Sequence, residues 1–329
     1  MALIIGLIVF VFIIGLCIGS FLNVVILRSL SEESIVFPAS KCPKCQTPLK
    51  WWHNIPVISY IFLRGKCAFC KEPISIQYPI IELFTAIVFT LCFFKFGLSF
   101  DTLFAWIISA LLIVIAMTDI KEKVVFDIHT YSLIGVGITY ALIILAVALY
   151  QNITGGTFVV NKELFLLNPL SISLFGALLG AAVMEIAARL GYFVAGTRAF
   201  GEGDTLIAAG LGAVFGWKTL LLILAVSIFI QVIFTLPVFV KKLIDKKDIK
   251  TVITLAIFSI YAITFFIISK TQLLLNDWVY LTLAAILAII GLYLCKLIIS
   301  GIKKESKDEL TYLPFGPAMV AAAFLFLLF

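Results

Sequence analysis

Apolar runs long enough to cross a lipid bilayer constrain this chain more than any other feature of its sequence. Of its 329 residues, 63% are hydrophobic and only 13% are charged, about half the charged share of a typical soluble domain. A membrane-crossing helix needs about 20 apolar residues, and lipid leaves backbone groups no outside partner, which favours helices. We therefore predict an all-α polytopic membrane protein of about ten transmembrane helices. The runs that predict them are 2–27, 78–94, 102–118, 128–150, 170–188, 205–217, 219–240, 251–269, 278–300 and 314–329.

The sixth run, 205–217, is short for a full crossing, and we interpret it as one half of a hairpin with 219–240. The first run is not preceded by any Lys or Arg, and a small-residue cleavage pattern is absent. Both features favour a retained first span over a secretory signal.

The distribution of basic residues predicts how the chain is oriented. If the N-terminus lies outside the cell, the inner loops hold all Lys and Arg residues except Lys95, Lys162, Lys218 and Lys270. Such an excess is typical of the cytoplasmic side. The same orientation requires 205–217 to count as a crossing, because 241–250 would otherwise lie outside. The net charge of +6 is spread over several loops, so we expect contact with membrane lipid and no nucleic-acid binding.

These patterns predict five regions and no internal repeat. They are a first transmembrane helix (1–27), a cytoplasmic loop domain (28–77), a transmembrane core (78–240), a further transmembrane pair with basic flanks (241–310) and a final helix (311–329).

The loop domain contains two cysteine pairs, in "CPKC" (Cys42, Cys45) and "CAFC" (Cys67, Cys70). Paired C-x2-C patterns are typical of metal sites, although the interval between these pairs slightly exceeds the usual range. Four thiolates suit a closed structural zinc site, and a cytoplasmic location argues against disulfides. Iron, a redox pair or unmetallated thiols are the alternatives. The other cysteines, Cys17, Cys92 and Cys295, are expected to be small core residues.

Two aspartates, Asp119 and Asp204, fall at ends of predicted spans on the same side of the membrane. Carboxylates are costly in the hydrocarbon region and often mark function there. Two carboxylates brought face to face share one proton, so that one can activate water while the other donates to a substrate carbonyl. Gly201 and Gly203 precede Asp204 and would permit a tight turn and close approach of a substrate strand. This hypothesis is an aspartic protease at the membrane surface.

The same residues allow simpler interpretations. An Asp at a helix N-terminus is an ordinary capping residue, and intramembrane acids also occur in transporters and channels. A membrane scaffold with a partner-binding cysteine loop is a third possibility. Glu82 and Glu185 are expected to pair with polar or basic neighbours. Asn23 is expected to form an interhelical hydrogen bond. His53 and His129 are too isolated to predict a histidine metal site.

The sequence resembles the type IV prepilin peptidase family over nearly its whole length. The matching blocks, in order, are "GSFLNVVILR" (19–28), "CPKCQTPLKWWHNIPVISYIFLRGKCAFC" (42–70), "ISIQYPIIELFTA" (74–86), "TDIKEKVVFD" (118–127), "GEGD" (201–204) and "YLPFGPAM" (312–319). Each block alone is weak evidence for the family, but the order and spacing of all six blocks together are specific to it.

This resemblance implies that Asp119 and Asp204 form a catalytic pair and that the four cysteines bind zinc. It implies a membrane aspartic endopeptidase in the bacterial inner membrane that cleaves the basic leader of type IV prepilins and pseudopilins at the cytoplasmic face. It further implies methylation of the new N-terminus with S-adenosylmethionine, for which no nucleotide fingerprint is visible and no residue can be chosen.

The sequence departs from the family pattern in three places. Leu206 stands where the family often has a Lys, two positions after the Asp of "GEGD", and Glu202 adds an acid beside that Asp. The spans at 251–269 and 278–300 are additional.

Overall fold

The structure is a computed structural model that describes residues 2–37, 39–154, 168–195, 200–245 and 314–329, with a few isolated residues between 253 and 286. Its regular structure within these ranges is helical, apart from two isolated β-bridges in the cysteine loop. Six helices in this part of the chain are long and apolar enough to cross a membrane, and a seventh apolar helix is shorter. The predicted count of about ten is therefore not confirmed. The predicted spans at 251–269 and 278–300 lie almost wholly outside the described residues, as does Cys295.

The chain forms two compact units. One comprises residues 1–186, 200–228 and 314–329, and the other comprises 187–199 and 229–313. The first unit contains both aspartates and all four loop cysteines, so it holds every candidate site residue. Most of the second unit lies outside the described residues.

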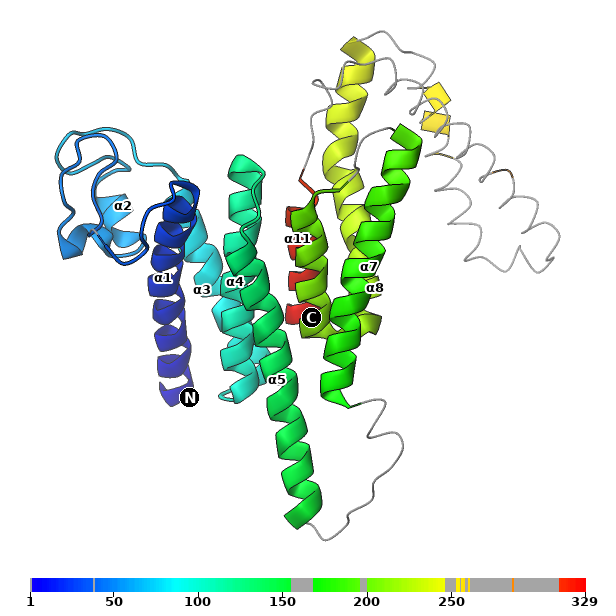
Figure 1. Cartoon of the computed structure of the whole chain (residues 1–329). Coiled ribbons are helices and arrows are strands. Elements are labelled where there is room, and N and C mark those ends of the chain that lie inside the picture. Colours follow the sequence, from blue (N-terminus) through cyan, green and yellow to red (C-terminus); the bar gives the residue numbers. More distant parts are fainter. Residues whose placement is uncertain are drawn as a thin grey trace. The chain divides into compact units, whose positions relative to one another are not determined.

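The helices of the first unit begin and end where the sequence supplies caps. Helix α1 spans Ala2–Leu30, α3 spans Gln77–Phe96 and α4 spans Phe100–Glu122 (Figure 1). Gly97 ends α3 with a positive φ of 67°, the conformation that glycine adopts most easily. The side chain of Ser99 caps α4 by accepting a hydrogen bond from the backbone N–H of Thr102 at 3.3 Å, as N-cap serines do.

Small residues allow α1 and α3 to pack closely. A β carbon at Gly15 would lie 2.5 Å from Ala86 Cα, and one at Gly19 would lie 2.7 Å from Glu82 Cα. Asn23 on α1 donates a hydrogen bond to the carbonyl of Tyr78 on α3 at 3.1 Å. The prediction that Asn23 forms an interhelical hydrogen bond is therefore confirmed, and glycine-mediated packing of this kind is common between membrane helices.

The remaining long helices are α5 (Asp127–Thr154), α7 (Pro169–Ala195) and α8 (Glu202–Asp245). Ideal β carbons at Gly176 and Gly180 of α7 would collide with the backbones of Gly212 and Ala208 of α8. Since the residue numbers rise along α7 as they fall along α8, α7 and the first half of α8 run antiparallel. Two backbones in such contact leave no room for side chains at these positions.

Helix α8 breaks at Gly216, where φ is 74° and ψ is 166°. Its apolar part, Glu202–Thr235, has 34 residues, about 50 Å of continuous helix and far longer than the roughly 30 Å hydrocarbon core. The break falls at the end of the run 205–217, close to the point where the sequence separates it from the run 219–240. We therefore interpret α8 as two membrane segments joined at Gly216.

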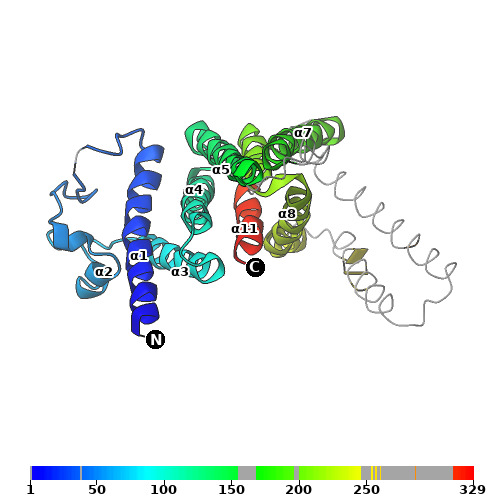
Figure 2. The ribbon, with the colours of Figure 1, turned by 90° about the horizontal axis from the view of Figure 1, so that it is seen from below.

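The last helix, α11 (Gly316–Leu328), lies between α4 and the first half of α8 (Figures 1 and 2). Its residues are almost all apolar, and most of them are buried. A segment from the end of the chain thus completes the core around the aspartates.

Chain direction brings the candidate site residues to one end of these helices. Helix α3 runs away from the cysteine loop and α4 returns toward it, so the loop and the C-terminal end of α4 share one end of the unit (Figure 1). The starts of α8 and α11 lie at this end as well. This common end agrees with the single side that charge counting predicts for both aspartates and the loop.

Candidate functional site

The cysteine loop is built from two matching turns that lie 25 positions apart in the sequence. The strings "KCPKCQTPL" and "KCAFCKEPI" each close with an antiparallel bridge, Lys41 to Pro48 and Lys66 to Pro73. Inside each turn the first cysteine donates a backbone hydrogen bond five residues along the chain, Cys42 N to Thr47 O (3.0 Å) and Cys67 N to Glu72 O (2.8 Å). A second bond closes each turn, Leu49 N to Ser40 O (2.8 Å) and Ile74 N to Gly65 O (2.7 Å). Gln46 and Lys71 take the same left-handed φ. The expectation of no internal repeat is therefore wrong for this loop.

The four sulfur atoms have the geometry of a tetrahedral metal site. The Sγ atoms of Cys42, Cys45, Cys67 and Cys70 all lie within 4.8 Å of one another, and those of Cys42 and Cys70 are 3.9 Å apart. Zinc at about 2.3 Å from each sulfur would separate them by roughly 3.8 Å. A disulfide needs about 2 Å. The cluster therefore fits a metal ion such as zinc with all four positions filled by protein.

Electrostatics in the cluster favour two of the thiolates. Hydrogen bonds from the side chain and backbone of Thr47 lower the pKa of Cys45 to about 6, and backbone hydrogen bonds from Cys70 and Phe69 lower the pKa of Cys67. The pKa of Cys70 is raised to about 11, because burial and the neighbouring thiols outweigh the backbone of Glu72. Thiolates this close together repel one another. A divalent cation among them would offset that repulsion, since metals bind the thiolate form.

Asp204 lies in the first turn of α8 and only 5% of its surface is exposed. Its Oδ2 accepts a hydrogen bond from the backbone N–H of Gly201 at 3.1 Å, the back-reaching contact of an N-terminal capping box. Asp204 therefore does cap the N-terminus of α8, as the simpler interpretation expects. Capping alone does not explain the burial of an acid, because exposed acids cap helices equally well.

Asp119 lies near the end of α4 and is 4% exposed. Its carboxylate is close enough to that of Asp204 to interact electrostatically. Among the described residues, Asp119 Oδ2 is a buried atom without a hydrogen-bond partner. Such atoms are rare in folded proteins and call for an explanation. A carboxylate oxygen kept available for water or substrate would explain this one.

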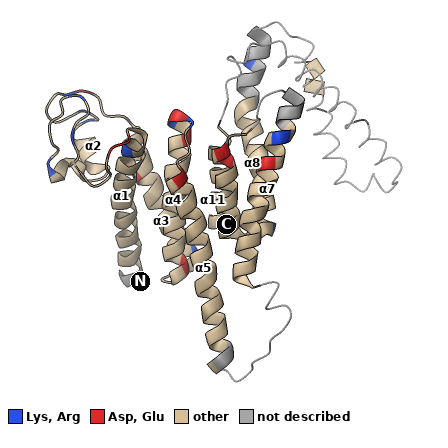
Figure 3. Ribbon diagram, in the orientation of Figure 1, with Lys and Arg blue, Asp and Glu red and all other residues tan. Residues whose placement is uncertain are grey.

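Helix α11 supplies a third element at the aspartates. A β carbon at Gly316 would collide with Asp119 Oδ2 and lie 3.0 Å from Ile207 on α8. The backbone amide of Gly316 faces the same carboxylate, and the rings of Phe200 and Phe315 meet nearby at 5.2 Å between centroids. The starts of α8 and α11 therefore converge on the end of α4. Figure 3 shows acidic residues at the end of α4 and the start of α8.

The glycines before Asp204 do not use a left-handed backbone, and one of them has a packing role. The described glycines with positive φ are Gly65, Gly97 and Gly216, so neither Gly201 nor Gly203 forms a left-handed turn. A β carbon at Gly203 would lie 2.6 Å from Val125 Cβ. Gly203 therefore allows the start of α8 to approach the segment that joins α4 to α5, which keeps the two aspartates together.

Glu82 and His129 each have a polar partner among the described residues. Glu82 accepts a hydrogen bond from the backbone N–H of Val57 at 2.8 Å, which confirms a polar partner for this acid. His129 Nε2 lies 3.2 Å from the Ser29 hydroxyl. Cys92 is buried as predicted, whereas Cys17 is exposed on α1, so the core prediction is wrong for Cys17.

Sequence reasoning missed Gly316 as a site residue. The available signal was the string "LPFGP" directly before the final apolar run. In that string a glycine precedes a proline in the first turn of a helix, a position where proline fits without loss of a hydrogen bond.

Family models match both halves of this architecture. Residues 13–96 match the bacterial peptidase A24 N-terminal domain, and residues 106–236 match the type IV leader peptidase family. The first match contains the four cysteines, and the second contains Asp119 and Asp204. No solved structure matches the chain.

Three curated relatives with the name prepilin leader peptidase/N-methyltransferase show the extent of the similarity. The protein from Myxococcus xanthus (strain DK1622) is 35% identical over 65% of this chain and 57% of its own length. That from Neisseria gonorrhoeae is 34% identical over 65% of this chain and 76% of its own length. The protein from Klebsiella pneumoniae is 32% identical over 64% of this chain and 86% of its own length. The chain thus spans somewhat more than half of the Myxococcus relative.

Both domain matches and the identity to the curated relatives lead to the same assignment: this multi-pass membrane protein belongs to the type IV leader peptidase family.

Proposed function

We propose that this protein is a membrane aspartic endopeptidase that cleaves the basic leader from type IV prepilins or pseudopilins and then methylates the new N-terminus. The observation that carries the proposal is the buried pair of Asp119 and Asp204, with an oxygen of Asp119 left without a partner. The names of the relatives support the substrate class and both activities.

In the proposed mechanism the two carboxylates share one proton. The ionised member removes a proton from a water molecule, which attacks the scissile carbonyl, while the protonated member donates to the carbonyl oxygen. The hydrogen bond from Gly201 holds the Asp204 carboxylate in place. Because Asp119 and Asp204 are buried near helix ends, substrate would meet them in a partly dry environment, where proton sharing is strongest.

We place the reaction at the cytoplasmic face, with the N-terminus of the chain outside. Two observations support this orientation: the excess of Lys and Arg in the loops on that side, and the common end of the helices at which the cysteine loop and the aspartates lie (Figure 1). A transporter is less well supported, because the acids lie near one end of the helices.

Zinc at the four cysteines would serve as a structural ion. A closed tetrahedral site leaves no position for water or substrate. The metal would therefore hold the two matching turns of residues 28–77 together, and it takes no part in the peptide cleavage described above.

The proposal is tested by replacing each aspartate with asparagine. Asp119→Asn and Asp204→Asn keep the side-chain size but cannot share a proton, so cleavage should fall about a thousandfold or more. The assay is leader removal from a prepilin, a chain with a basic leader, a glycine and an apolar helix, in membranes containing equal amounts of each variant. Glu202→Gln, a change at an exposed acid two residues from Asp204, is the control and should retain most activity. Near-normal cleavage by either Asn variant would refute the aspartyl assignment.

A further inference from the structure

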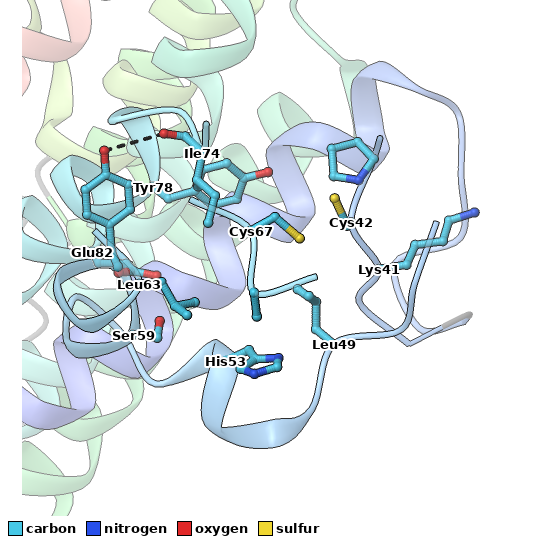
Figure 4. A pocket seen from close by; sticks show the side chains of 13 residues that line it. Lys41, Cys42, Leu49, His53, Ser59, Leu63, Cys67, Ile74, Tyr78 and Glu82 are labelled. Atoms are coloured by element: carbon cyan, nitrogen blue, oxygen red, sulfur yellow. Dashed lines mark hydrogen bonds between the residues drawn. The ribbon is translucent and has the colours of Figure 1, made fainter. Parts of the chain in front are cut away.

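The short helix α2 (Ile58–Phe62) of the cysteine loop turns its polar side chains toward the protein. Ser59 and Tyr60 line a small pocket together with Glu82 of α3. Leu63, directly after α2, lines it as well, and Figure 4 shows Ser59, Leu63 and Glu82 in the same part of the pocket. A helix that faced water would be expected to turn these polar residues outward.

The apolar side chains of α2 are exposed instead. Ile58, Ile61 and Phe62 are 49%, 66% and 83% exposed. Their spacing of i, i+3 and i+4 places them on one face of a helix, and no residue of α2 is buried. A contiguous exposed apolar surface indicates contact with a partner or with a membrane.

Two exposed tryptophans lie close to this face. The 3-10 helix η1 (Trp51–Asn54) contacts α2. The rings of Trp51 and Trp52 meet edge to face at 5.4 Å between centroids, and Lys50 Nζ lies 5.0 Å from the centroid of the Trp52 ring. Tryptophan beside lysine is typical of the membrane–water interface, where rings lie at headgroup level and ammonium groups reach toward water. The apolar loop surface comprises Trp51, Trp52, Ile58, Ile61 and Phe62.

The contact of the loop with α3 indicates how deep α2 lies. The backbone N–H of Val57, directly before α2, donates a hydrogen bond to Glu82 at 2.8 Å. Glu82 lies roughly 8 Å along α3 from its first residue, Gln77. Since α3 has 20 residues, about the number that crosses the hydrocarbon core, α2 begins at a depth within this span and not beyond its end.

Helix α1 indicates nearly the same depth. A β carbon at Gly19 would lie 2.7 Å from Glu82 Cα, so Gly19 and the start of α2 are level. Residues 2–19 are all apolar, and Gly19 is about 16 Å from the end of α1 at Leu30, near the boundary of a roughly 30 Å core. Figures 1 and 2 both show α2 beside α1, on the side away from α4. Interfacial helices bury their apolar faces about 5–10 Å into this boundary.

The charge of the loop favours anionic lipid over other occupants. Between Glu33 and Glu72 the sequence has no acid. It has six exposed basic residues there: Lys41, Lys44, Lys50, Arg64, Lys66 and Lys71. Anionic headgroups attract such clusters at a membrane surface. The same charge disfavours a basic prepilin leader and a second copy of this surface, because like charges repel.

We propose that the apolar loop surface lies in the membrane leaflet nearest the cysteine loop and binds anionic phospholipid. Its side chains lie among the upper parts of the acyl chains, and the basic residues contact headgroup phosphates. This contact holds the cysteine loop against the membrane at the end of the helices where the aspartates lie. The inference does not depend on the proposed peptidase or methylation activity.

Photolabelling of the zinc-loaded full-length protein in lipid nanodiscs measures this contact. The probe is phosphatidylglycerol with a diazirine near the glycerol end of one acyl chain, and mass spectrometry locates the label. Residues 51–62 should be labelled at least about tenfold more than residues 43–48, a polar turn of the same loop. Replacing the surrounding phosphatidylglycerol with neutral phosphatidylcholine should lower the labelling of 51–62 several-fold. Equal labelling of the two segments would overturn the proposal.

Variants of the surface keep the test decisive. Ile61→Ser with Phe62→Ser should reduce the labelling of 51–62 at least about fivefold, because apolar contact with lipid is lost. Zinc content should not change, since both side chains are exposed, and Trp51→Ser is a second surface change if it does. Val36→Ser, at an exposed apolar residue outside this surface, is the matched control and should label normally.

Unchanged labelling in the surface variants would contradict the proposal. So would protection of residues 51–62 from hydrogen exchange that appears only when a prepilin is added, which would make this surface a substrate-docking site.

Discussion

The cysteine loop and the aspartate site differ in how the sequence builds them. The loop brings its four ligands from residues 42–70, through two matching turns held by local backbone hydrogen bonds. The aspartate site combines Asp119, Asp204 and Gly316, from three helices that are far apart in sequence. A local site depends on turn geometry and metal, whereas a distributed site depends on helix packing. Loss of the metal should therefore disrupt the cysteine loop and leave the aspartate site intact. Disturbed helix packing should disrupt the aspartate site and leave the loop intact.

The largest expected effect is metal loss from the loop. The wild-type protein should contain about one zinc per chain, and Cys42→Ser with Cys45→Ser should remove nearly all of it, because folding and metal binding are coupled in such sites. Residues 28–77 should then become sensitive to protease. Elemental analysis and limited proteolysis measure both effects. Unchanged zinc in this variant, or no zinc in the wild type, would count against the site.

A smaller effect is expected at the distributed site from Gly316→Ala. The new methyl group would displace the Asp119 carboxylate, and a shift of about 1 Å at a reacting group can cost roughly a hundredfold in rate. Stability should change little, because only the end of a side chain must move. Cleavage rates and thermal unfolding measure the two quantities.

Gly135→Ala is the matched control for this change, since a β carbon at Gly135 of α5 meets nothing within 4 Å. Normal cleavage by Gly316→Ala would show that α11 has no part in placing Asp119. Loss of zinc from this variant would contradict the independence of the two regions.

The smallest effect is expected from Gly203→Ala, whose methyl group would meet Val125 Cβ at 2.6 Å. The contact separates the start of α8 slightly from α4, so cleavage should fall about tenfold, less than for Gly316→Ala. Shortening the neighbour in the double variant Gly203→Ala/Val125→Ala should restore much of the lost rate. If the double variant is as slow as the single one, crowding against Val125 is not the cause.

Sequence patterns predict the local parts of the molecule well. The runs 78–94 and 102–118 lie within α3 and α4, and the gap between 217 and 219 adjoins the break at Gly216. Cysteine spacing predicts the metal cluster because its four ligands are set by two short turns. These features depend on apolar length and on neighbours in the chain.

The distributed features could not be predicted in the same way. No spacing rule connects Gly316 to Asp119, because their contact arises only when α11 packs between α4 and α8. The role of Gly203 depends similarly on Val125 in another segment. The hydrogen bond between Val57 and Glu82 likewise forms only where the loop folds back on α3. Such contacts depend on helix packing, which the one-dimensional pattern does not contain.

The most direct test of the division between the two regions is mass spectrometry of the pilin N-terminus, where methylation adds one CH₂. Asp204→Asn should leave a prepilin uncleaved but should methylate a supplied, already cleaved pilin. Cys42→Ser/Cys45→Ser should lose methylation more severely than cleavage, since this variant unfolds the loop while the helices that hold the aspartates keep their packing. Equal loss of both activities in the cysteine variant, or loss of methylation in Asp204→Asn, would contradict the assignment of separate activities to the two regions.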